Sequence, residues 1–175
     1  MLSKADIEKY FIAEKTESLM FLIIGIIAIA LAVIFYFSLK TNFHKGAAIP
    51  LLVVGLIQAI VGYTVYARTD EQRISNVYAY DMDPAKIKSA ELPRMKEVKK
   101  RFVIYRWIEI VLLITGVVLM LLFQRDEPKN FWFGLGLTLA IQAGLMLVAD
   151  YIAEQRANIY TNQLEIFSAG KKTNE

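Results

Sequence analysis

One glutamate lies inside an apolar segment, where a negative charge is expensive. Glu109 falls between Arg106 and Arg125, in a stretch that holds no other charged residue. A lone carboxylate in hydrocarbon costs several kcal/mol, so we expect Glu109 to be paired, protonated or turned toward a wet cavity. The simpler interpretation is an ion pair with Arg106, three residues earlier on the same helix. The alternative is a proton or cation site.

Two glutamines stand near the middle of other apolar segments. Each amide of Gln58 and Gln142 carries two donors and an acceptor that lipid cannot satisfy. We expect hydrogen bonds across helices, and a polar ring that lines a solute path between subunits is the alternative. Close helix contacts are also expected at small residues spaced four apart: Ala28 and Ala32, Gly55 and Ala59, and Ala140 and Gly144.

Charged and aromatic side chains recur just beyond the apolar segments, where helices would leave the membrane. They predict an intracellular ion-pair cluster or a solvated surface, and the tyrosines favour a docking surface for a protein partner. The candidate residues are Glu71, Arg73, Glu154, Arg156, Tyr78 and Tyr160.

A basic segment precedes the third apolar stretch. Lys96, Lys99, Lys100 and Arg101 predict contact with anionic lipid headgroups, worth about 1 kcal/mol per basic residue. The pattern needs no nucleic acid to explain it, and we expect no nucleic-acid partner.

No pattern in the sequence predicts a catalytic, cofactor or metal site. The chain has no cysteine, and its one histidine, His44, cannot build a triad or a zinc site by itself. Asp81 and Asp83 form an acidic pair that lacks a phosphate-binding motif, so we interpret Asp83 as a helix cap.

Length and hydropathy identify the elements that position these residues. Hydrophobic residues make up 56% of the 175, and uncharged runs cover residues 19–39, 46–67 and 131–149, with a fourth at 107–124 interrupted by Glu109. Each is long enough to cross roughly 30 Å of hydrocarbon. The sequence therefore predicts an all-α integral membrane protein, a bundle of four transmembrane helices with cytoplasmic helical extensions.

The distribution of lysine and arginine predicts the orientation. Sixteen of these residues fall in the N-terminal segment, the middle loop and the tail, which includes Lys171 and Lys172, whereas four fall in the two short loops. Because basic loops stay in the cytoplasm, both termini should be cytoplasmic, in a cytoplasmic or inner membrane.

Five segments follow from these patterns. Residues 1–18 predict an interfacial amphipathic helix, 19–67 a first transmembrane hairpin, 68–101 a cytoplasmic helical loop, 102–150 a second hairpin, and 151–175 a helical extension and tail.

Several helix boundaries are also expected. We expect the second span to start near Pro50 and its helix to continue past Ala67, and a short helix to begin at Pro84. Another helix should restart at Pro93, and the last should run from Phe131 to about residue 167.

Matching triplets suggest that the two hairpins are tandem repeats. IQA occurs at 57–59 and 141–143, and EQR at 71–73 and 154–156, which are 84 and 83 residues apart. This register would place Gln58 and Gln142 at equivalent positions.

Three classes of function remain open. The favoured hypothesis is a non-enzymatic membrane component, such as an accessory subunit or an immunity-type protein, that binds a protein partner through its helical extensions. The first alternative is a homo-oligomeric channel or transporter for a small ion or solute. A lipid-modifying enzyme is the third.

Overall fold

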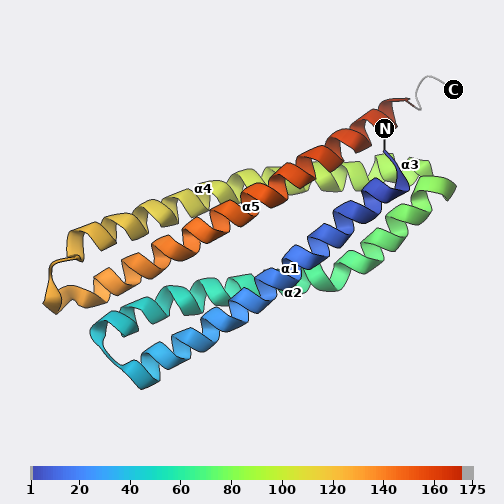
Figure 1. Ribbon diagram of the computed structural model, residues 1–175. Helices are drawn as coiled ribbons and strands as arrows, with labels where there is room; N and C mark the ends of the chain where they lie inside the picture. The colour runs from blue at the N-terminus through green and yellow to red at the C-terminus, as the bar shows by residue number, and fades with distance from the viewer. Residues whose placement is uncertain (1, 171–175) are drawn as a thin grey trace.

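Four long helices form two antiparallel hairpins in the computed structural model, which describes residues 2–170. The elements are α1 (Lys4–Ile34), the π-helical turn η1 (Phe35–Leu39), α2 (Asn42–Met82), α3 (Pro84–Lys86), the π-helical turn η2 (Ile87–Glu91), α4 (Leu92–Phe123), η3 (Glu127–Lys129) and α5 (Asn130–Gly170). The first hairpin is α1 with α2, and the second is α4 with α5 (Figure 1). Lys171 and Lys172 lie outside the described residues.

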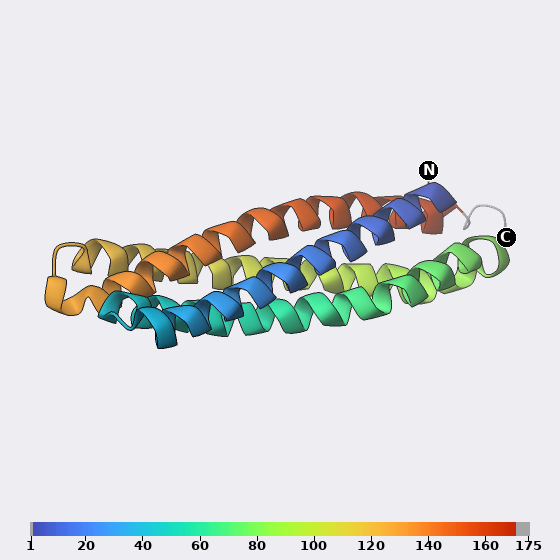
Figure 2. The ribbon, with the colours of Figure 1, turned by 60° about the horizontal axis from the view of Figure 1, so that its bottom comes forward.

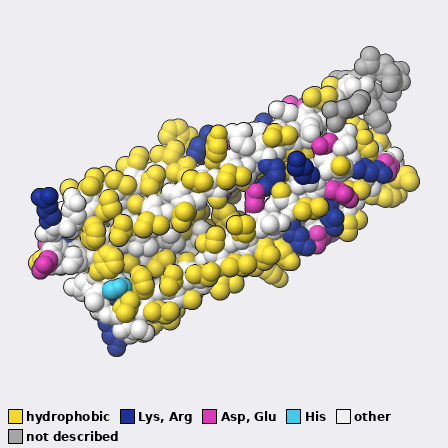
Figure 3. Space-filling model, in the orientation of Figure 1, with side chains coloured by type: hydrophobic (Ala, Val, Ile, Leu, Met, Phe, Trp, Pro, Cys, Tyr) yellow, Lys and Arg dark blue, Asp and Glu magenta, His cyan; other side chains and the backbone are white. Residues whose placement is uncertain are grey.

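The molecule is elongated, and its two ends differ in chemistry. The start of α1, the end of α5 and α3 lie at one end, and the two hairpin turns lie at the other (Figures 1 and 2). Charged side chains gather over the half that holds α3, whereas apolar side chains cover most of the visible remainder (Figure 3). We call the charged half, residues 2–18, 68–101 and 151–170, the stem.

The apolar half consists of helices suited to a membrane. Four continuous helices, Lys4–Leu39, Asn42–Met82, Pro84–Phe123 and Glu127–Gly170, are each long and apolar enough to cross one. Large apolar side chains such as Ile26, Val111 and Leu145 point outward from these segments and are more than half exposed. An outward apolar surface of this kind is suited to lipid, so the predicted all-helical, membrane-type fold is confirmed at this level.

A seven-residue spacing governs which side chains face the neighbouring helix. It runs through the apolar half and the stem without interruption, as expected for helices that supercoil around each other. Buried members of these stripes are Phe11, Ser18, Gly25 and Ala32 in α1; Ala48, Gly55, Gly62, Thr69 and Asn76 in α2; Met95, Glu109 and Gly116 in α4; and Gly136, Ala143, Ala157 and Leu164 in α5.

Both hairpins are closed by the same backbone contact. A Cβ added to Gly25 would lie 2.6 Å from the Ala59 nitrogen and 2.7 Å from the Gly55 oxygen. One added to Gly116 would lie 2.6 Å from the Ala140 nitrogen and 2.8 Å from the Gly136 oxygen. Glycine is therefore required at both positions, where the helix backbones touch.

In this repeated contact Gly55 of α2 and Gly136 of α5 hold equivalent positions, which are 81 residues apart in the sequence. The IQA and EQR triplets suggested a repeat offset of 84 or 83 residues. At the spacing of the contact, Gln58 matches Leu139 and not Gln142, so the two glutamines are not equivalent.

The stem has its own hydrophobic core, built by all four helices. Ile7 and Phe11 are fully buried there, among Ala79 of α2, Met95 of α4 and Leu164 of α5. The structure differs here from the expected interfacial helix, because the N-terminal segment is the first part of α1 and its apolar side chains contact protein. A capping box at Ser3 and Asp6 begins the helix.

Two proline positions also differ from expectation. Pro50 lies inside α2, which starts at Asn42 because the Thr41 hydroxyl accepts a hydrogen bond from the His44 amide at 3.3 Å. Pro93 lies in the first turn of α4, as expected, but no break precedes it, since α3, η2 and α4 are continuous from Pro84 to Phe123. The predicted cap at Asp83, the continuation of α2 past Ala67 and the long last helix are confirmed.

Candidate functional site

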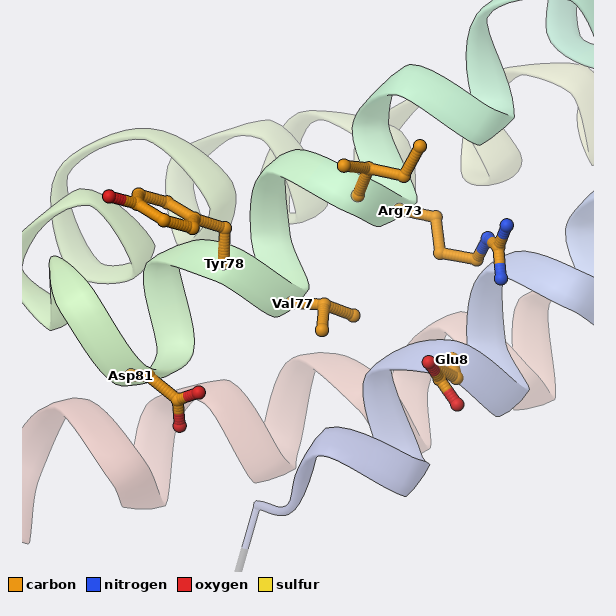
Figure 4. Close-up of a pocket in the computed structure, with 6 residues that line it drawn as sticks. Glu8, Arg73, Val77, Tyr78 and Asp81 are labelled. Atoms are coloured by element: carbon orange, nitrogen blue, oxygen red, sulfur yellow. The ribbon is translucent and has the colours of Figure 1, made fainter.

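An open groove on the stem is lined in part by two of the predicted docking residues, Arg73 and Tyr78. It has a volume of about 350 Å³ and lies between α1 and α2. Figure 4 shows Arg73 and Val77 of α2 on the side that faces Glu8 of α1, whereas the ring of Tyr78 projects from α2 away from α1. The lining residues are Glu8, Arg73, Ile74, Val77, Tyr78 and Asp81, which we call the stem groove.

The stem groove combines exposed apolar groups with charges. Tyr78 is 65% exposed and Ile74 is 64% exposed. Asp81 is held by Lys4 at 2.5 Å, and Arg73 reaches Asp70 of its own helix at 3.7 Å. Glu8 has no ion-pair partner among residues 2–170, so its carboxylate remains available to a ligand.

Tyr160, the other tyrosine predicted to dock a partner, is instead buried in the stem core. It is 2% exposed and stacks on Tyr10 with ring centroids 4.3 Å apart. Burial raises the pKa of both phenols, and the nearby carboxylates Glu91 and Glu14 act in the same direction. Tyr160 therefore joins α5 to α1 and is not a surface residue.

Beside this pair lies a buried ion pair that the sequence reasoning missed. Glu91 is 4% exposed and accepts hydrogen bonds from Arg94 Nε at 2.8 Å and Nη2 at 2.7 Å. Burial is the largest single influence and lowers the pKa of Arg94, but these bonds, the charge of Glu91 and the nearby acidic groups of Tyr10 and Glu14 together outweigh it, so the net effect is a raised pKa. The Arg94 guanidinium also lies 5.5 Å from the centre of the Phe11 ring.

Glu14 completes the polar part of the stem core. Its Oε1 accepts a hydrogen bond from the Tyr10 hydroxyl at 3.1 Å, while its Oε2 is buried and has no partner in the described structure. Burial raises the pKa of Glu14, although Arg94, Arg68 and Arg156 oppose the shift.

The two EQR triplets do not form one cluster. Arg156 pairs with Glu17 of α1, and Glu154 pairs with Arg106 of α4 at 2.5 Å. Glu71 is exposed, and Arg73 bonds within α2. Glu154 and Arg156 of the second triplet therefore link α5 to α4 and α1, whereas Glu71 and Arg73 of the first triplet make no ion pair to another helix among residues 2–170.

The expected Arg106–Glu109 ion pair is absent from the described residues. Arg106 instead donates hydrogen bonds to both carboxylate oxygens of Glu154 on the facing helix. Glu109 is 3% exposed and faces Asp150 across the hairpin. Sequence reasoning missed Asp150 because the uncharged run ends at residue 149, so Asp150 was treated as the boundary of the second hairpin and not as an inward-facing residue. Asp150 continues the seven-residue stripe of Gly136 and Ala143, which is the signal that could have found it.

Gln58 and Gln142 are buried inside one chain, at 6% and 8% exposure. Neither side-chain oxygen has a hydrogen-bond partner among residues 2–170, so the expected cross-helix bonds through these atoms are not formed. Their burial also removes them from any surface between subunits.

The basic segment at the start of α4 divides into two parts. Lys96 pairs with Glu165 at 3.2 Å and Arg101 with Glu97 at 3.6 Å. Lys99 and Lys100 form no ion pair within the part of the chain that the structure describes. These two lysines are therefore the members best placed to contact lipid headgroups.

No group of three metal-ligating side chains occurs within residues 2–170. Comparison with protein-family models, with curated proteins and with solved structures finds no match.

Proposed function

We propose that the chain is a non-enzymatic integral membrane protein that docks a protein partner in the stem groove. The observation that carries this proposal is the groove itself, where exposed Tyr78 and Ile74 lie beside the unpaired carboxylate of Glu8. Tyrosine and adjacent apolar side chains are typical of binding hot spots.

The stem is suited to present such a groove because it is rigid. Its four helices share the core around Phe11, and Tyr80 of α2, one of the two helices that line the groove, donates a hydrogen bond to the Leu2 carbonyl at 3.1 Å. A preformed surface loses little conformational entropy on binding, which favours recognition of a partner.

The chemistry of the groove points to one kind of occupant. Val77 and Ile74 offer an apolar surface, and Glu8 offers a negative charge without a partner. The complementary ligand is a segment of another protein that presents an apolar side chain next to a lysine or arginine.

The proposed location is a cytoplasmic or inner membrane, with the stem and both termini in the cytoplasm. The fifteen basic residues of the stem and tail, with Arg106 next to them, support this orientation, because basic segments beside spans are retained in the cytoplasm. Lys99 and Lys100 would then contact anionic headgroups at the inner surface.

Site-specific photocrosslinking in intact cells tests the docking proposal. A photoreactive amino acid at Tyr78 should give one discrete adduct, whereas the same group at Ile166, 61% exposed on the stem portion of α5, should not. The partner, identified by mass spectrometry and purified, should reproduce the adduct, and Glu8→Lys should reduce its yield several-fold. Equal yields at Tyr78 and Ile166, or no effect of Glu8→Lys, would contradict the proposal.

A homo-oligomeric channel or transporter is a second candidate, favoured by the small cavity beside Glu109. With the glutamines buried within one chain, a path between copies would have to be lined by other residues. Ion flux through liposomes that contain purified protein would support this candidate, and flux equal to that of empty liposomes would count against it.

A further inference from the structure

A cavity of about 50 Å³ lies between α4 and α5 at the boundary between the apolar half and the stem. Its walls combine apolar side chains, among them Phe102 and Leu147, with the carboxylates of Glu109 and Asp150 and with the ion pair of Arg106 and Glu154. Glu109 is 97% buried, and neither of its carboxylate oxygens has a hydrogen-bond partner among the described residues. A buried carboxylate without a partner is costly in such a cavity unless it is neutralised, and no residue among 2–170 pairs with Glu109.

The nearby cations are already bound. Arg106 on α4 donates to both oxygens of Glu154 on α5, at 2.5 and 2.6 Å. Arg156 on α5 pairs with Glu17 on α1. Besides Glu109, Glu17 is the charged residue of a neighbouring helix that acts on Asp150. Glu109 and Asp150 are therefore left facing each other without a counter-ion from residues 2–170.

Glu109 and Asp150 line the same small cavity and face each other closely enough for a side-chain hydrogen bond once one of them carries a proton. Two ionised carboxylates cannot form that bond, because neither carries a hydrogen to donate. One proton added to the pair removes one of the two charges and supplies the missing donor, as in other sites where two carboxylates share a proton.

We propose that Glu109 and Asp150 form a proton-binding site that holds one shared proton at neutral pH. A small metal cation is the poorer occupant. Hard cations need about six oxygen ligands, whereas the pair offers four. The third carboxylate of the wall, Glu154, is neutralised by Arg106, and most of the exposed wall is apolar. The cavity has room for about one or two waters, at about 30 Å³ each.

The site has a mechanical consequence for the hairpin. Loss of the shared proton places two negative charges opposite each other across α4 and α5 in an apolar setting, where they repel strongly. The helices should then separate at this level or admit water. The inference is independent of partner docking, because it depends on the α4–α5 hairpin and not on the stem groove.

Infrared difference spectroscopy on protein in nanodiscs tests the proposal. The wild type should show the C=O stretch of a protonated carboxylic acid at neutral pH, and the band should disappear as the pH is raised. Both Glu109→Gln and Asp150→Asn should lose the band, because a side-chain amide supplies the donor that the proton provides in the wild type. Glu97→Gln, at an exposed position of α4, is the matched control and should keep it.

Three results would overturn the proposal. The first is the absence of such a band from the wild type at neutral pH. The second is a band that survives in both amide variants, provided that circular dichroism and gel filtration show them to be folded. The third is a band that sodium or calcium ions abolish at constant pH, which would assign the site to a metal cation.

Discussion

Arg106 binds both carboxylate oxygens of Glu154, on the facing helix, and leaves Glu109 of its own helix opposite Asp150. One hairpin therefore carries a closed ion pair and an uncompensated acid pair side by side. The first hairpin has small hydroxyl residues at the corresponding level, Ser18 and Thr69, whose side chains bond to their own helix backbones. The acid pair is thus a property of the second hairpin.

The glycine contacts give a prediction about stability. Gly25→Ala and Gly116→Ala should each lower the free energy of unfolding by about 1–3 kcal/mol, because the new methyl group meets backbone atoms of the facing helix at 2.6 Å. The midpoint of unfolding by sodium dodecyl sulfate in mixed micelles measures the change.

Gly144→Ala is the matched control for these variants. A Cβ at Gly144 meets only a Leu113 methyl group at 3.9 Å, so the variant should be neutral or stabilised by up to about 1 kcal/mol through helix propensity. Equal losses at the three glycines would contradict the backbone contact.

The buried ion pair of the stem gives a second prediction. Glu91→Gln should destabilise the fold by about 3 kcal/mol, because it leaves the Arg94 guanidinium buried without its counter-ion. The double variant Glu91→Leu with Arg94→Met should recover most of this loss, since it removes both charges. Unfolding midpoints of the three proteins test it, and a double variant less stable than Glu91→Gln would refute this explanation.

Glu14 gives a third prediction, concerning pH. Because burial raises its pKa above the ordinary value of 4.5, the folded state holds this proton more tightly than the unfolded state. Stability from this group is present below pH 4.5 and is lost as the pH rises through the pKa of the folded state. The free energy of unfolding of Glu14→Gln should therefore increase relative to that of the wild type as the pH rises from 4.5 through the pKa of the folded state.

Chemical denaturation at a series of pH values measures that difference. Glu97→Gln, on the exposed surface of α4, should follow the wild-type profile throughout. Parallel profiles for Glu14→Gln and wild type would show that burial of Glu14 does not control the pH dependence.

Much of the fold was predictable from elementary constraints. Length and hydropathy identified the four long helices, and the Asp83–Pro84 pair marked a helix start correctly. Hydropathy could not show which face of each span packs inward, because the spans are apolar on all sides. The size of the side chains carries that information, since glycine, alanine and serine recur every seven residues at Ser18, Gly25 and Ala32.

The polar residues were harder to predict because their partners come from other helices. The pairing of Arg106 with Glu154, and of Glu109 with Asp150, requires the register of α4 against α5. Local spacing instead favoured Arg106 with Glu109. Tyr160 likewise resembled a surface tyrosine until packing against Tyr10 was known.

We propose that the stem, with its groove, lies on the cytoplasmic side of a membrane that the chain crosses four times. Because the chain has no cysteine, single-cysteine variants report position without background. Cysteines at Asn42 and Glu127 should react with a membrane-impermeant maleimide in intact cells, whereas one at Tyr78 should react only after permeabilisation. Labelling of Tyr78→Cys in intact cells, or protection of both turn positions, would contradict the account.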